Sequence, residues 1–121
     1  MKCPCNPNKL YKNCCKKAHD DIFSVKTSEE LMRSRYSAFV LGNTDYLHKS
    51  HHSSTRLSNR EYKELKKWTK SVDWVKLQIH NSTNNSVEFT AFFIENGNLE
   101  TIKEYATFCK ENNHWVYLNA V

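Results

Sequence analysis

Four cysteines lie within the first fifteen residues of this 121-residue chain, in two closely spaced pairs. Cysteine thiolates are the ligands that structural zinc sites use, and four of them complete a tetrahedral shell around Zn²⁺. A complete shell has no open position for a substrate, so the pattern predicts structural zinc rather than a catalytic metal. The four expected ligands are Cys3, Cys5, Cys14 and Cys15.

Other uses of these cysteines are a disulfide or redox pair, or a chance cluster. A disulfide framework needs an oxidising compartment. The opening residues contain no apolar signal region, so we expect reduced thiols and a cytoplasmic location. Disulfides between Cys3 and Cys5, or between Cys14 and Cys15, would also strain the bond geometry because the loops are so short.

Residues 1–19 resemble the SEC-C motif, a zinc-binding tail found on SecA translocases and on many bacterial proteins. The resemblance rests on the two cysteine pairs and on Lys9, Tyr11 and Lys12 between them. In SecA-type tails the last ligand is often histidine. Here it is Cys15, and His19 is the alternative.

The turn after the second cysteine departs from the motif. SEC-C motifs usually have Gly-Ser-Gly at this point, where this chain has Asn6-Pro7-Asn8. Glycine supplies a positive φ in tight turns, and asparagine and proline also favour turns. We therefore expect the turn to be kept at some cost, which leaves weaker zinc binding open.

The basic residues are concentrated at the N-terminus. The formal charge is +5, and four deprotonated thiols with one Zn²⁺ would lower it to about +3. Lysines near the cysteines could offset the negative charge of a Zn(Cys)₄ centre, or attract RNA, the ribosome or an acidic protein face. Tyr11 is the only aromatic residue there, which argues against a dedicated single-strand binder. The five lysines are Lys2, Lys9, Lys12, Lys16 and Lys17, and the first acid is Asp20.

The remaining chain changes from helical to alternating apolar periodicity. Helices are expected over residues 28–41 and 58–72, with a short helical turn at 43–50 and a polar connection at 16–27. Strands are expected over 74–80, 87–95, 99–110 and 114–118. Helices followed by an antiparallel meander predict an α+β fold, with the helices covering one face of a curved four-stranded sheet. We divide the chain into a zinc knuckle, residues 1–19, and an α+β domain, residues 20–121.

A second resemblance covers nearly the whole chain. Residues 31–39 (LMRSRYSAF), with Gly42 and the residues around Tyr46, are similar to the signature of the YchJ-like family, and Trp74 and residues 115–118 also agree. The resemblance implies a nuclear-transport-factor-two-like fold, in which a bent sheet and helices form a cone with an internal pocket. It implies a fold and a zinc site more than an activity. Such proteins usually have His-Glu before the third strand's hydroxyl-bearing segment, where this chain has Lys103-Glu104.

The candidate pocket residues are Arg35, Tyr36, Tyr46 and Glu104. Arg35 falls on the apolar stripe of its helix, and Glu104 shares strand parity with apolar neighbours. We expect the two to form a neutralising pair, which favours a structural role because a carboxylate held by arginine is a poor base. A catalytic base at Glu104 is the alternative. His51 and His52 are a further possible metal or acid/base site, although adjacent residues rarely act together because their side chains diverge.

These observations favour a non-enzymatic binding or adaptor module that docks on a protein or ribosomal partner through the basic knuckle. The alternative is a small-molecule binder, or a hydrolase- or isomerase-type enzyme, that uses the pocket of the cone. Nucleic acid is a third candidate partner, and a homodimer through the open sheet face is also considered. No stretch of eighteen apolar residues is present, so no membrane partner is expected.

Overall fold

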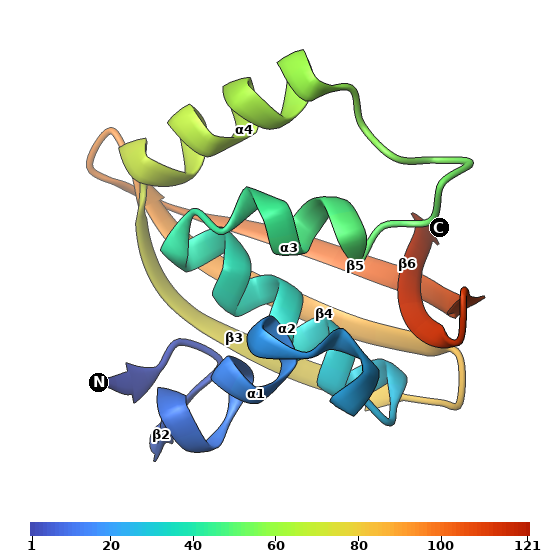
Figure 1. Ribbon diagram of the computed structural model, residues 1–121. Helices are drawn as coiled ribbons and strands as arrows, with labels where there is room; N and C mark the ends of the chain where they lie inside the picture. The colour runs from blue at the N-terminus through green and yellow to red at the C-terminus, as the bar shows by residue number, and fades with distance from the viewer.

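An antiparallel sheet in the order β3-β4-β5-β6 forms the main layer of the computed structural model, which describes residues 1–121 (Figure 1). Its strands are β3 (Asp73–Ser82), β4 (Ser86–Glu95), β5 (Asn98–Glu111) and β6 (His114–Ala120). Each strand pairs with the next one along the chain, so every connection is a hairpin. The β4–β5 turn contains Asn-Gly, and both residues have the positive φ that such hairpin turns require.

Three helices cover one face of this sheet: α2 (Ser28–Leu41), α3 (Thr44–Lys49) and α4 (Asn59–Ser71). Helix α2 contacts β3, β4 and β6, and α4 packs across α2 and α3. The predicted α+β class with a four-stranded antiparallel sheet is confirmed.

Local capping fixes where the long helices begin and end. The Thr27 hydroxyl accepts the Glu30 N–H at the start of α2, and Gly42 ends the helix in the left-handed conformation with φ 68°. At α4, Ser58 and Glu61 each accept the other's backbone N–H in a complete capping box.

The N-terminal segment contains more regular structure than the sequence predicts. A hairpin of β1 (Lys2–Cys3) and β2 (Asn6–Leu10) leads through η1 (Tyr11–Asn13) into α1 (Cys15–Asp20) and then η2 (Ile22–Ser24). The expected polar connection over residues 16–27 therefore contains α1 and η2. Ile22 and Val25 dock it on the core, whereas Phe23 is exposed. The short helix forms because Ala18 and His19 are buried against α2, although its own sequence lacks a long apolar stripe.

One hydrophobic core extends from the N-terminal segment to the sheet. Three of the four N-terminal cysteines and Ala18 belong to the same cluster of buried residues as Leu31 and Phe108. The boundary proposed between residues 19 and 20 falls inside α1, and the division into two domains stays a prediction. No helix combines the length and apolar character needed to cross a membrane.

Candidate metal centre and interior cavity

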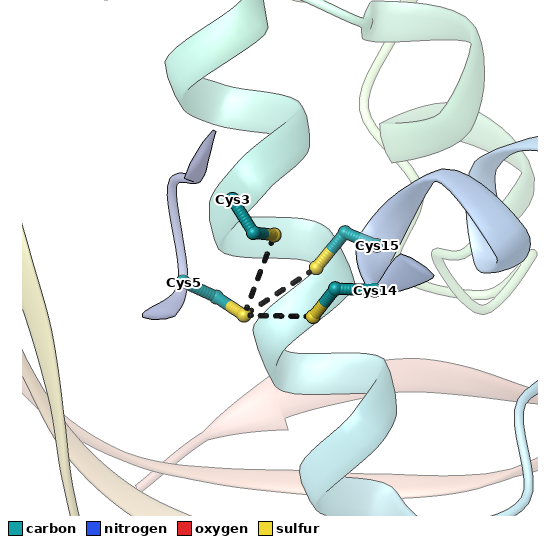
Figure 2. A group of neighbouring side chains, drawn as sticks. All are labelled: Cys3, Cys5, Cys14 and Cys15. Atoms are coloured by element: carbon teal, nitrogen blue, oxygen red, sulfur yellow. Dashed lines mark hydrogen bonds between the residues drawn. The ribbon is translucent and has the colours of Figure 1, made fainter. Parts of the chain in front are cut away.

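Two separate segments bring four cysteine sulfurs together. Cys3 and Cys5 come from the β1–β2 hairpin, and Cys14 and Cys15 lie at the start of α1. Figure 2 shows the four side chains pointing toward one another beside helix α2. All four sulfurs lie within 4.8 Å of one another.

The spacing of the sulfurs suits a tetrahedral metal ion. Cys5 Sγ lies 3.7 Å from Cys3 Sγ, 3.6 Å from Cys14 Sγ and 3.5 Å from Cys15 Sγ. A tetrahedral zinc with Zn–S bonds of about 2.3 Å requires sulfurs about 3.8 Å apart. The observed distances far exceed a disulfide bond of about 2.05 Å, and all the cysteines are free thiols. The donor set and its spacing therefore fit Zn²⁺, which prefers four thiolates in structural sites.

The four thiols differ in their pKa values because they share hydrogen bonds and are buried to different degrees. The Cys15 hydrogen bond lowers the pKa of Cys5 to about 5, with Cys14 and Cys3 contributing further hydrogen bonds. Burial raises the pKa of Cys14 to about 11, and donation to Cys5 raises the pKa of Cys15. One thiolate thus accepts hydrogen bonds from neighbouring thiols, and metal binding must release the protons of those neighbours.

Helix α2 packs against the cysteine cluster. Arg33 Nη1 donates to the carbonyl oxygen of Cys5 at 3.2 Å, and its Nε forms an ion pair with Glu29 at 3.0 Å. The Ser37 hydroxyl lies 3.7 Å from Cys3 Sγ. Cys3, Cys5 and Cys15 are buried, so a metal held here would lie between the hairpin and the helix.

His19 is engaged elsewhere. Its Nε2 lies 2.8 Å from the carbonyl oxygen of Ser34, and its Nδ1 lies 2.6 Å from the Tyr11 hydroxyl. Both ring nitrogens therefore have protein partners, whereas the four cysteines form the metal-ligating group without His19.

The chain does not turn at Asn6-Pro7-Asn8 as expected: these residues begin strand β2, and the hairpin turns just before them, at Pro4 and Cys5. In the first 41 residues no backbone φ is positive. Just after the turn, the side-chain oxygen of Asn6 accepts the N–H of Asn8 at 3.0 Å. No residue of this segment therefore has the left-handed conformation that favours glycine, and the effect of replacing Gly-Ser-Gly on zinc binding stays a prediction.

A separate cavity of about 230 Å³ lies between α2, α4 and the sheet. A smaller cavity of about 110 Å³ adjoins it, and both are bordered by Met32, Phe39, Phe89 and Glu104. Arg35 borders the larger cavity and Tyr36 the smaller one.

Arg35 and Glu104 do not form the expected pair. No ion pair within 4.0 Å joins them. Arg35 Nη1 donates instead to the carbonyl oxygen of Leu47 at 3.1 Å and to the Ser50 hydroxyl at 2.7 Å. Burial raises the pKa of Glu104, while the positive charge of Arg35 acts against that rise. Arg35 does not pair with Glu104 because a backbone carbonyl and a hydroxyl at the end of α3 already hold its guanidinium.

Tyr36 and Tyr46 differ in their placement. Burial raises the pKa of each hydroxyl to about 12. The Tyr36 ring packs edge-on against Trp74 beside the smaller cavity. Tyr46 borders neither cavity, and its hydroxyl bonds to the Ser34 hydroxyl at 2.6 Å. It is a core residue rather than the pocket residue that we expected.

Two polar residues of the larger cavity, Tyr62 and Tyr117, were not among the candidates, and a third, His51, was named with His52 as a possible metal or acid/base site. His51 faces the larger cavity, and its Nδ1 lies 3.3 Å from the Tyr62 hydroxyl. Tyr117 packs under the guanidinium of Arg35, with its ring centre 4.8 Å from Cζ. Tyr62 lies on the apolar stripe of its helix, which indicated a core position but not its neighbours. Tyr117 lies in the expected last strand, but nothing in that strand's pattern indicated a place beside Arg35.

Comparisons with known proteins agree on one family. The family model described as "YchJ, middle NTF2-like domain" matches residues 27–120. A UPF0225 protein of Vibrio parahaemolyticus is 41% identical over 123 residues, which cover 97% of this chain and 72% of that protein. A UPF0225 protein of Bordetella pertussis is 37% identical over 124 residues, which cover 97% of this chain and 90% of that protein.

Two solved structures share the fold of this chain, including its N-terminal segment. The crystal structure of a SEC-C motif containing protein from Psychrobacter arcticus has a TM-score of 0.79 and 31% identity, covering 98% of this chain and 81% of its own. The solution structure of a SEC-C motif containing protein from Rhodopseudomonas palustris has a TM-score of 0.81 and 25% identity, covering 100% and 98%. This chain, with a cysteine cluster able to hold a metal ion, therefore belongs to the YchJ-like (UPF0225) family.

Proposed function

We propose that this chain is a non-enzymatic adaptor in which structural Zn²⁺ holds the knuckle, residues 1–19, for docking on an acidic face of a partner protein, free or on the ribosome. The observation that carries the proposal is the exposed charge of this segment. All five of its lysines are exposed, it contains no acid, and only Lys16 has an ion-pair partner, Asp20.

The lysines exceed what the metal centre needs. A Zn(Cys)₄ centre has two net negative charges, so five lysines leave the knuckle positive. Lys9 and Lys12 lie outside every ion pair of the structure. Unpaired surface lysines attract an acidic surface within a Debye length, which is about 8–10 Å. This attraction increases the rate of association with that surface.

A protein partner is favoured over single-stranded nucleic acid. Single-strand binders stack bases on exposed aromatic rings. Tyr11 is the only aromatic residue in the knuckle, and His19 engages both its hydroxyl, at 2.6 Å, and its ring, at 5.6 Å between centres. The knuckle therefore lacks a free stacking platform.

The zinc contributes by fixing the shape of the charged surface. The hairpin and α1 meet at the four sulfurs, and Arg33 joins the hairpin to α2. A surface that is already ordered loses less entropy on binding than a flexible tail with the same charge. Removing the metal should therefore weaken docking even with every lysine still present.

The experiment compares three variants of the full chain in affinity capture from the source cell. Lys9→Glu/Lys12→Glu reverses charge on the knuckle. The matched control, Lys63→Glu/Lys67→Glu, makes the same change on exposed residues of α4. Cys14→Ser/Cys15→Ser removes metal ligands. Captured proteins are quantified by mass spectrometry with and without ribonuclease, and a purified partner is then titrated at increasing salt.

A partner lost with the two knuckle variants, kept with the α4 control and insensitive to ribonuclease would support the proposal. Equal capture by both charge-reversed variants would overturn it. Loss of the partner after ribonuclease treatment would replace it with nucleic-acid docking, for which binding should weaken steeply with salt.

Self-association through the open sheet face stays a prediction. The outer face of the sheet is mixed in character. Lys76 lies over the Phe92 ring, with Nζ 5.0 Å from its centre, and His80 bonds to the Thr90 hydroxyl at 2.7 Å. Light scattering on the purified chain would measure whether a dimer forms.

A further inference from the structure

Arg35 has hydrogen-bond donors that the protein does not use. The residue is 6% exposed, and its Nη1 makes both of its hydrogen bonds, to Leu47 and Ser50. No sealed side-chain nitrogen or oxygen in the structure lacks a partner. The unbonded Nε and Nη2 must therefore reach accessible space, and the space that Arg35 borders is the larger cavity.

The charge of Arg35 also lacks a counter-ion. No carboxylate lies within 4.0 Å of the guanidinium. Burial lowers the pKa of Arg35 to about 10, which leaves it charged at neutral pH. A buried charge without an opposite charge is expensive. The Nε and Nη2 edge of a guanidinium presents two parallel N–H groups, the arrangement that binds a carboxylate with two hydrogen bonds.

The rest of the larger cavity is mostly apolar and suitably sized. A cavity of about 150 Å³ can hold a benzene ring, and this one measures about 230 Å³. The additional space accommodates a short acidic group on such a ring. The apolar walls come from α2, α3, α4, the segment before α4 and β4, and include Met32, Phe39, Leu47, Leu57, Leu65 and Phe89.

We infer that this cavity binds a small monocarboxylic acid with an apolar body, whose carboxylate docks on the Nε and Nη2 edge of Arg35. Tyr117 stacks under the guanidinium and limits how it can turn. The site is independent of the knuckle, since none of the four cysteines borders this cavity.

A substitution of Glu104 gives a second test of the site, with an effect opposite to that of a substitution of Arg35. The Glu104 carboxylate makes no hydrogen bond or ion pair and borders the same cavity. A negative charge there works against an anionic ligand, so the neutral and nearly isosteric Glu104→Gln should tighten binding. The substitution breaks no hydrogen bond or ion pair of the protein, so it is less disruptive than a change at the buried Arg35.

The test titrates three probes of similar shape and different charge into ¹⁵N-labelled protein: phenylacetate, phenylacetamide and phenethylamine. Hexanoate serves as the aliphatic acid. Chemical shifts are followed for the backbone and for the Arg35 Nε–H. We expect phenylacetate to bind more tightly than the amide, and the amine to bind least. Arg35→Gln should weaken phenylacetate binding by about tenfold or more, because a charged hydrogen bond contributes about 1.5–3 kcal/mol.

Saturable phenylacetate binding that moves the Arg35 Nε–H and tightens in Glu104→Gln would establish the site. No saturable binding by either acid would overturn it. Equal affinity for acid and amide would also overturn it, since the guanidinium would then have no role. Tightest binding of phenethylamine would assign the cavity to cations at Glu104 instead. If Arg35→Gln fails to fold, unchanged or weaker phenylacetate binding by Glu104→Gln would still count against the site.

Discussion

His19 Nε2 lies 2.8 Å from the carbonyl oxygen of Ser34, so α1 is bonded directly to the middle of α2. On the other side of the ring, Nδ1 meets the Tyr11 hydroxyl at 2.6 Å. Burial lowers the pKa of His19 and keeps the ring neutral. A neutral ring can donate from Nε2 to the carbonyl and accept at Nδ1 from the tyrosine. The knuckle is therefore attached to the helix by a contact that does not depend on metal.

Replacing His19 with alanine separates attachment from metal binding. The change leaves the Tyr11 hydroxyl without its partner and opens a gap beside Tyr46, so the free energy of unfolding should fall by about 2 kcal/mol. Zinc content should stay at one ion per chain. Urea unfolding and metal analysis measure the two effects, with exposed Lys17→Ala on the same helix as control. A folded His19→Ala protein without zinc would place His19 among the ligands.

Cys15→Ser tests the metal centre itself. A serine hydroxyl does not replace a thiolate as a zinc ligand, so zinc should be lost. Cys15 is 4% exposed and shares the core with α2. Its loss should therefore lower the melting temperature by roughly 10 °C or more. Cys109→Ser, on a cysteine outside the cluster, is the matched control and should keep its zinc. Zinc retained by Cys15→Ser would contradict a four-cysteine shell.

The sequence predicts most accurately where local interactions decide the structure. The bounds of α2 follow from the Thr27 cap and the Gly42 stop, each of which acts within one helical turn. The cysteine cluster is equally readable because its ligands lie within fifteen residues. Helix α1 is missed because its burial comes from contact with α2, which no pattern within residues 15–20 reveals.

The cavity depends on long-range contacts that sequence cannot assign. The apolar stripe of α2 correctly directs Arg35 inward. It cannot indicate that Leu47 and Ser50 provide the acceptors, because these lie in another helix and at its end. Strand parity likewise turns Glu104 inward without fixing its distance from Arg35. An Arg35–Glu104 pair was chemically reasonable, but residues in α3 and at its end provide the hydrogen-bond acceptors of Arg35 instead.

His51 should make the protein less stable in acid. Burial, with the positive charges of Arg35 and Arg56 and the neighbouring His48 and His52, lowers the pKa of His51 from 6.5 to about 4. The unfolded chain takes up the proton below about pH 6.5, while the folded chain resists until about pH 4. The contribution of His51 to the free energy of unfolding is therefore fully present above pH 6.5. It falls as the pH drops toward 4, by at most about 3 kcal/mol.

Urea unfolding of the wild type and His51→Gln across this pH range isolates that contribution, because carboxylates and metal ligands titrate in both proteins. The difference in unfolding free energy between the two should change with pH between 6.5 and 4 and level off above 6.5. A constant difference across the range would mean that His51 does not titrate differently in the folded and unfolded chains.

Gly42→Ala should destabilise the turn that joins α2 to α3. Gly42 has φ 68°, where an alanine side chain is strained by about 1 kcal/mol. An added Cβ would meet only the end of the Lys70 side chain at 3.6 Å, an ordinary contact, so the penalty is conformational rather than steric. Asparagine tolerates this conformation, and Gly42→Asn should lose less unfolding free energy in urea than Gly42→Ala. Equal losses would instead make crowding the cause, because asparagine shares the Cβ but not the backbone strain.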